Sequence, residues 1–195
     1  MKPLFFAASL FFAFGFTAAL EDQPFIDEIE AFKASDQVSP PPPGAVIFVG
    51  SSSIRLWSGL DSIFSEYKAV NRGFGGSTFK EAILYAEDLV LKYDPAAVFI
   101  YEGDNDIAAG FPTDEILKDA ETFAGMIRDR HPDVPIIFIS PKPSIARWNL
   151  RSQYLELNSR LQTWASHESG IFYIDVWRHM LGSDGKPIPD IFIED

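Results

Sequence analysis

Residues 45–57 read AVIFVGSSSIRLW, and the expected organisation of the chain follows from this stretch. The apolar run from Ala45 to Val49 follows several prolines and precedes Gly50 and three serines. The run is too short for a helix and rich in β-branched and aromatic side chains, which favours a buried central strand. In open α/β sheets, ligands bind at the carboxyl edge of the strands. We therefore expect these serines to lie at a functional edge of a sheet.

Similar apolar runs recur along the chain, and helical patterns separate them. Strand-like runs occupy residues 46–49, 69–71, 96–101, 134–139 and 171–176. Between them, apolar residues recur at helical spacing over residues 83–93, 116–127 and 150–164. This alternation predicts an α/β fold with three layers, in which a five-stranded parallel sheet carries helices on both faces.

Composition excludes several classes of function. The chain has 195 residues, of which 47% are hydrophobic, so it can bury one sizeable core. Its formal net charge of -12 argues against nucleic acid and against anionic membrane surfaces as partners. Cysteine is absent, which excludes disulfides and thiolate chemistry, and three scattered histidines offer little for a metal site. We expect no metal and no cofactor, and the oligomeric state stays open.

The first residues resemble a targeting segment. Lys2 precedes an apolar run from Leu4 to Phe16, and small residues allow cleavage after Ala19. The alternative is an uncleaved anchor, but the run is shorter than the roughly 20 residues of a spanning helix. We expect residues 1–19 to be a signal peptide and the mature protein to be periplasmic or secreted, without stable membrane insertion.

After the signal peptide, the remaining chain divides into a short N-terminal segment and one main domain. Apolar residues at helical spacing predict a helix between Glu21 and Asp36, and Pro40–Pro43 form a stiff connector. We therefore assign residues 20–43 to an N-terminal helix with a proline-rich connector, and residues 44–195 to the main domain.

Three polar motifs follow the first three predicted strands. They are GSSS at residues 50–53, NRGFGGST at residues 71–78 and GDND at residues 103–106. Each motif alone is also typical of an ordinary turn. Parallel strands, however, would bring all three to one edge of the sheet. Acyl transfer needs a nucleophilic hydroxyl and several hydrogen-bond donors aimed at an oxyanion, and these motifs can supply both.

From about Val46 onward the chain resembles the SGNH hydrolases, also called GDSL-type lipases and esterases, and in particular a bacterial exported subgroup. The resemblance implies a flavodoxin-like fold and a serine esterase for small acyl, acetyl-sugar or lysophospholipid esters. By the same resemblance, Ser52 is the nucleophile that forms an acyl-enzyme, and Gly76 and Asn105 contribute to the oxyanion hole. Ser51 stands where the namesake motif has aspartate, as in that subgroup.

The last block of this family is Asp-x-x-His, and Asp195 matches its aspartate. The matching histidine would come three positions later. Without an imidazole, a serine hydroxyl is a poor nucleophile. We therefore expect a truncated copy of a longer protein, nearly inactive by itself, which lacks a C-terminal helix and exposes apolar surface near the first and last strands. The alternative is a pseudoenzyme or a secreted binding module of the same fold.

Three weaker interpretations concern other polar residues. Asp175 and His179 are four positions apart and could form an internal dyad. Residues 104–106 superficially suggest a cation site, although the glycine and distant glutamate of a calcium loop are missing. Arg147 and Trp148 are candidates for the rim of a substrate site, and a structural role is an equal alternative.

Overall fold

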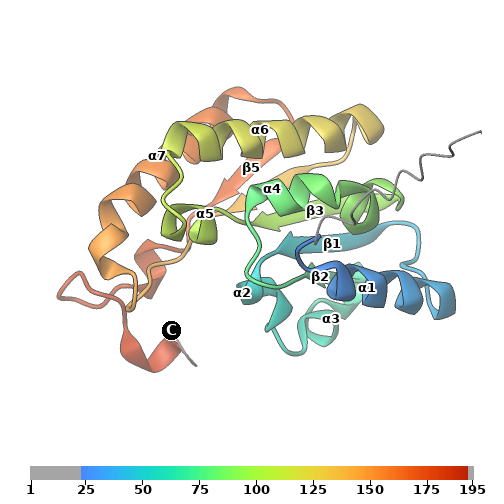
Figure 1. The fold of residues 1–195 in the computed structure, drawn as a ribbon, viewed down its shortest axis with the longest axis horizontal. Coiled ribbons are helices and arrows are strands. Elements are labelled where there is room, and N and C mark those ends of the chain that lie inside the picture. Colours follow the sequence, from blue (N-terminus) through green and yellow to red (C-terminus); the bar gives the residue numbers. More distant parts are fainter. Residues whose placement is uncertain (1–22, 193–195) are drawn as a thin grey trace, which may run out of the picture.

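The structure, a computed structural model, describes residues 23–192 and is built on one parallel sheet. The five strands run in the order β2-β1-β3-β4-β5, and every pair of neighbours is parallel (Figure 1). This order is that of flavodoxin-like doubly wound sheets, so the predicted α/β class is confirmed. The strands are β1 (Ala45–Gly50), β2 (Val70–Gly73), β3 (Pro95–Tyr101), β4 (Ile136–Ile139) and β5 (Ile171–Ile174).

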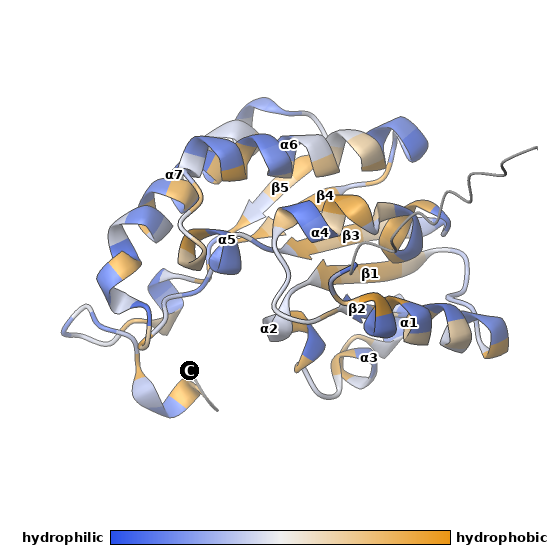
Figure 2. Cartoon of the chain, in the orientation of Figure 1, coloured by the Kyte–Doolittle hydropathy of each residue, from blue (hydrophilic) through white to orange (hydrophobic). Residues whose placement is uncertain are grey.

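The longer helices gather on one face of the sheet. Their apolar sides pack on Ile47 of β1 and Val98 of β3, which are fully buried. Figure 2 shows hydrophobic strands beside helices of mixed hydropathy, as expected when each helix turns one side to the core. These helical elements are α1 (Ile26–Val38), α4 (Phe79–Leu84), the π-helical turn η2 (Glu87–Leu91), α6 (Thr113–Arg130) and α7 (Arg151–His167).

The continuous helix predicted over residues 83–93 is divided. The α-helix α4 ends at Leu84, and the π-helical turn η2 follows. A π turn contains more residues than an α turn and therefore rotates the side chains that follow it. Here it brings Leu89 and Val90, which are adjacent in the chain, into the core together.

The second face of the sheet is covered only in part. Its small core contains Phe48 and is covered by α2 (Ser52–Arg55) and α3 (Leu60–Ile63). Beyond them a groove of about 620 Å³ runs across β1, β3, β4 and β5. Exposed apolar surface near the first and last strands is therefore present, and a further helix that covers it stays a prediction. The groove is lined by Val46, Phe48, Trp57, Phe64, Tyr67, Ala97, Phe99, Ile137, Ile139, Ile174 and Val176.

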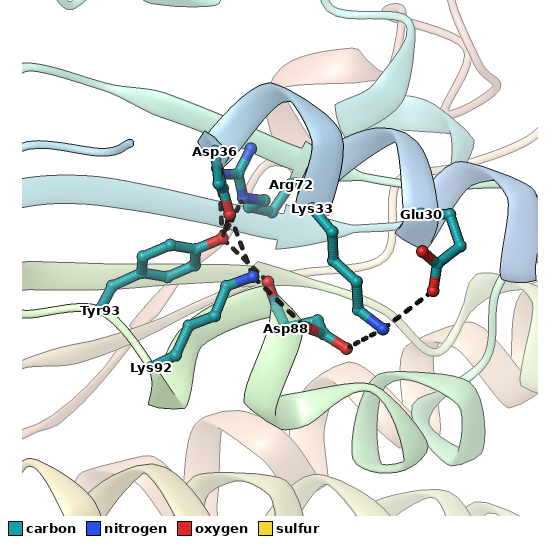
Figure 3. Close-up of polar contacts among 7 residues, drawn as sticks. All are labelled: Glu30, Lys33, Asp36, Arg72, Asp88, Lys92 and Tyr93. Carbon is teal, nitrogen blue, oxygen red and sulfur yellow. Dashed lines mark hydrogen bonds and ion pairs between the residues drawn. The ribbon is translucent and has the colours of Figure 1, made fainter. Parts of the chain in front are cut away.

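Helix α1 is fixed to the sheet by a charged cluster (Figure 3). The Asp36 carboxylate accepts hydrogen bonds from Arg72 of β2 and from the Tyr93 hydroxyl, and Lys92 lies 3.0 Å away. The Arg72 side chain is only 7% exposed, and its guanidinium lies 5.0 Å from the centre of the Phe32 ring. This cationic group is buried, so it depends on Asp36 for compensation.

Replacing Asp36→Asn should lower the free energy of unfolding by about 3 kcal/mol or more, because the Arg72 charge then stays buried without its counter-ion. Urea denaturation followed by circular dichroism measures the change. The matched control is Glu30→Gln, which removes the exposed partner of Lys33 in the same cluster and should cost less than about 1 kcal/mol. Equal, small losses in both variants would contradict the buried-pair interpretation.

Candidate functional site

The carboxyl ends of β1 and β3 meet at the point where the strand order reverses. The Ser51 amide donates to the Tyr101 carbonyl oxygen at 3.2 Å, across the two strand ends. A Cβ at Gly50 would lie 2.4 Å from the same oxygen, so only glycine fits there. In doubly wound sheets this reversal point is the usual place for a ligand. Figure 1 shows α2 and α5 (Asp104–Ala108) at this end of the two strands.

The three serines after β1 have different surroundings. Ser51 is 1% exposed and therefore closed to a substrate. The Ser53 side chain forms a hydrogen bond with the buried Tyr101 hydroxyl. Ser52 is partly exposed and is the first residue of α2. Of the three hydroxyls, that of Ser52 is therefore the best placed to react.

Gly76 and Asn105 lie side by side, although they come from different strand ends. A Cβ at Gly76 would be 3.8 Å from Asn105 Nδ2. That nitrogen donates to the Ser77 carbonyl oxygen at 2.9 Å. Asn105 reaches this place because Gly103 takes φ +104° and turns the chain from β3 into α5. The structure thus brings these two predicted residues together at the edge where β1 delivers Ser52.

The fourth predicted residue, Asp195, lies outside the described residues. The last described residue, Phe192, has its ring centre 5.1 Å from Lys142 Nζ. The Lys142 amide in turn donates to the Tyr101 hydroxyl at 3.2 Å. Phe192 therefore lies against the loop after β4, at the same edge of the sheet.

Two buried carboxyl groups beside Asn105 have a role that the sequence did not suggest. Glu102 Oε1 accepts from the Ser77 hydroxyl at 2.6 Å, and Asp106 Oδ1 accepts from the Phe79 amide at 3.1 Å. Burial raises the pKa of Glu102 well above its usual range and that of Asp106 to about 7. Both groups therefore hold the segment after Gly76 against the end of β3.

The motif at residues 103–106 acts through protein contacts. The Asp104 carboxylate is bound by Arg147 and by the Tyr154 hydroxyl, and Asp106 is bonded to the backbone of Phe79. Over residues 23–192 no group of three His, Cys, Asp or Glu side chains is arranged to hold a metal ion. The carboxylates that suggested a cation site thus serve the architecture of the sheet edge.

The remaining polar candidates also have partners. Asp175 Oδ1 accepts from the Trp177 amide at 2.9 Å, and its second oxygen pairs with Arg178 at 3.4 Å. The carboxylate thus faces groups other than the exposed His179, and no bond between the proposed dyad partners is present within the described chain. Trp148 stacks on Trp177 with ring centres 6.0 Å apart, which indicates a structural role.

Burial of Asp106 should make the stability of the protein depend on pH. Its pKa is about 7 in the folded chain and 3.8 ordinarily, so the folded state holds this proton more tightly. The stability that the protonated group contributes is complete below about pH 4 and is lost as the pH rises through about 7. Asp106→Asn keeps an acceptor for the Phe79 amide and should therefore flatten this decline.

Urea denaturation between about pH 4 and pH 8 measures the effect. At pH 8, Asp106→Asn should exceed the wild type by about 2–4 kcal/mol, and near pH 4 the two should converge. The matched control is Asp129→Asn on the exposed side of α6, which should follow the wild type. An unchanged pH profile of Asp106→Asn would show that this carboxyl is ionised at no cost.

Comparison with known proteins finds one matching sequence family and several solved structures of similar fold. The sequence model described as the GDSL-like lipase/acylhydrolase family matches residues 47–194. No curated protein sequence matches the chain. A GDSL-like lipase from Bacteroides thetaiotaomicron superposes with a TM-score of 0.72 at 18% identity, over 86% of each chain. At such identities the likeness concerns the fold.

Two further solved structures share this fold at lower similarity. A carbohydrate esterase of family 3 from Talaromyces cellulolyticus has a TM-score of 0.58 and 16% identity, over 75% of this chain and 89% of that one. The OSK domain of Drosophila Oskar has a TM-score of 0.57 and 13% identity, over 75% and 72% of the two chains. The described residues contain no helix that is long and apolar enough to cross a membrane.

Proposed function

Since the chain belongs to the GDSL-like lipase/acylhydrolase family, we propose that it is a serine esterase that forms an acyl-enzyme on Ser52. The observation that carries this proposal is the juxtaposition of Gly76 and Asn105 at the edge where β1 ends and Ser52 follows. Fold alone does not assign an activity, whereas a hydroxyl beside a set of donors supports acyl transfer.

In the proposed reaction, Ser52 Oγ attacks the carbonyl carbon of a carboxylic ester. The oxyanion that forms is stabilised by the backbone N–H groups of Ser52 and Gly76 and by Asn105 Nδ2. Each such donor is worth about 3–4 kcal/mol in the transition state. The alcohol leaves, the acyl group stays on Ser52, and water then releases the acid. These steps need no cofactor.

The proton of Ser52 requires a base. His131 Nε2 lies 3.2 Å from the Leu91 carbonyl oxygen, and His167 Nδ1 lies 2.7 Å from the Thr163 carbonyl oxygen, so both contact backbone elsewhere. We assign the base to a histidine three positions after Asp195, with Asp195 fixing its tautomer. Reading the coding sequence past Asp195 tests this assignment: a histidine codon at that place supports it, and a stop codon contradicts it.

The nucleophile is tested by labelling the full-length protein with a fluorophosphonate probe. Wild-type protein should be labelled, and Ser52→Ala should lose the label completely because the proposed nucleophile is then removed. The matched control Ser53→Ala should keep the label. Labelling that persists in Ser52→Ala would overturn the assignment. A folded wild-type chain without any label would instead favour a binding module.

We further propose that the substrates are small acyl, acetyl-sugar or lysophospholipid esters and that hydrolysis takes place in the periplasm or outside the cell. Residues 1–19, the proposed signal peptide, lie outside the described residues. If they are removed as proposed, N-terminal sequencing of the mature protein should give Leu20 as its first residue. A mature chain that starts at Met1 would contradict export by cleavage, and turnover of a panel of these three ester types would identify the substrate class.

A further inference from the structure

Asn105 must present a particular side of its amide to the site. A carboxamide has two N–H donors on its nitrogen and only acceptor capacity on its oxygen. One N–H of Asn105 already donates to the Ser77 carbonyl oxygen at 2.9 Å. The second N–H is then available beside Gly76, where the oxyanion would lie. If the amide rotated by half a turn, its oxygen would occupy that place and repel the negative charge.

The amide oxygen is held by Arg147. Both terminal nitrogens of the guanidinium, Nη1 and Nη2, lie 3.2 Å from Asn105 Oδ1. A guanidinium has donors only and stays protonated. It can therefore donate to the amide oxygen but cannot form a hydrogen bond with the amide NH₂ group. The half-turn of Asn105 would therefore place donors against donors at Arg147 and an oxygen against the Ser77 carbonyl oxygen. Two contacts would be lost together.

Arg147 is itself held from several sides. Its Nη1 also donates to the Asp104 carboxylate and, at 3.2 Å, to the Asp104 carbonyl oxygen. The Tyr154 hydroxyl of α7 donates to the same carboxylate, and the Arg147 amide donates to Ser144 Oγ at 3.0 Å. The side chains of Asp104 and Arg147 are 12% and 36% exposed, so this charge-assisted pair is largely shielded from water on the Asp104 side. The guanidinium is therefore fixed before any substrate arrives.

We propose that Arg147 is a positioning residue of the esterase site, which locks the Asn105 carboxamide with its nitrogen toward the oxyanion. This inference rests on the proposed function and adds to it the residue that orients one of the donors. From the sequence, Arg147 was a candidate for the rim of a substrate site, with a structural role as the alternative. The guanidinium instead faces Asp104 and Asn105, so its effect should fall on turnover and leave substrate binding nearly unchanged.

The test is a double-mutant cycle on the full chain with an ester that it hydrolyses. Asn105→Ala should lower kcat about 10²–10³-fold, the usual loss of one oxyanion donor. Arg147→Met should lower kcat about 10–100-fold with KM nearly unchanged, and Arg147→Lys should restore only part, because one ammonium cannot form the fork. In the Asn105→Ala background, Arg147→Met should cost less than about 2-fold.

The matched control is Arg151→Met, four positions further on, where the guanidinium lies 5.6 Å from the centre of the Trp148 ring. It should leave kcat unchanged. Equal losses from Arg147→Met in both Asn105 backgrounds would overturn the positioning role. A rise in KM at constant kcat would overturn it too, since it would show contact with the substrate.

A second measurement does not depend on turnover. In ¹⁵N–¹H spectra, the side-chain NH₂ pair of Asn105 is identified by its loss in Asn105→Ala. Arg147→Met should shift and broaden this pair, whereas Arg151→Met should leave it in place. If wild-type protein neither hydrolyses esters nor reacts with the probe, the proposed function fails, and these spectra still decide the positioning role. An unmoved Asn105 pair in Arg147→Met would overturn it.

Discussion

The contact between Gly50 and the Tyr101 carbonyl oxygen is the constraint on which the site depends. A Cβ at residue 50 would lie 2.4 Å from that oxygen and 2.7 Å from Ile54 Cγ1, so a larger residue would separate β1 from β3 or displace α2. The Gly50 carbonyl oxygen also accepts from the Phe74 amide at 3.0 Å, which adds β2 to the same junction. Three strand ends therefore meet here, and each is followed by one of the polar motifs.

The meeting of these strand ends requires that acidic groups be buried. Glu102 and Asp106 are only 2% and 1% exposed. Burial favours the neutral acid and raises the pKa of both groups, and each accepts a hydrogen bond from the segment after Gly76. Asp104 differs from these two groups because Arg147 compensates its negative charge. The edge of the sheet thus combines two carboxyl groups whose pKa is raised by burial and one ion pair, and these groups surround the candidate site.

The fold is asymmetric in how it covers its sheet. The long helices pack on one face, whereas α2 and α3 cover only the β2 and β1 side of the other face. Helix α1 belongs to the well-covered face and is tied to β2 through Asp36 and Arg72. Its N-terminal neighbour Phe25 packs on Phe74 with ring centres 5.7 Å apart, which supports the loop that carries Gly76. Helix α1 therefore helps to hold the loop of the candidate site in place.

Local patterns determined the class of fold and the edge at which the site lies. Short apolar runs and helical periods are properties of neighbouring residues, so the strands and the helices α6 and α7 could be predicted within a few positions. Ser52, Gly76 and Asn105 are site residues that the family resemblance of three motifs predicts, and the strand order explains why the ends of β1, β2 and β3 coincide. The π turn η2 was missed because no local pattern distinguishes it from a helix.

Tertiary structure alone decided which polar groups face one another. Arg147 and Asn105 are 42 positions apart, and Asp36 and Arg72 are 36 positions apart. The neighbouring residues in the sequence do not indicate which residue is the partner. A charged side chain is expected to be exposed to solvent, and only the folded structure shows that it is buried beside an opposite charge. Local sequence thus determines where the candidate site lies, and packing between distant segments determines how the Asn105 carboxamide is oriented there.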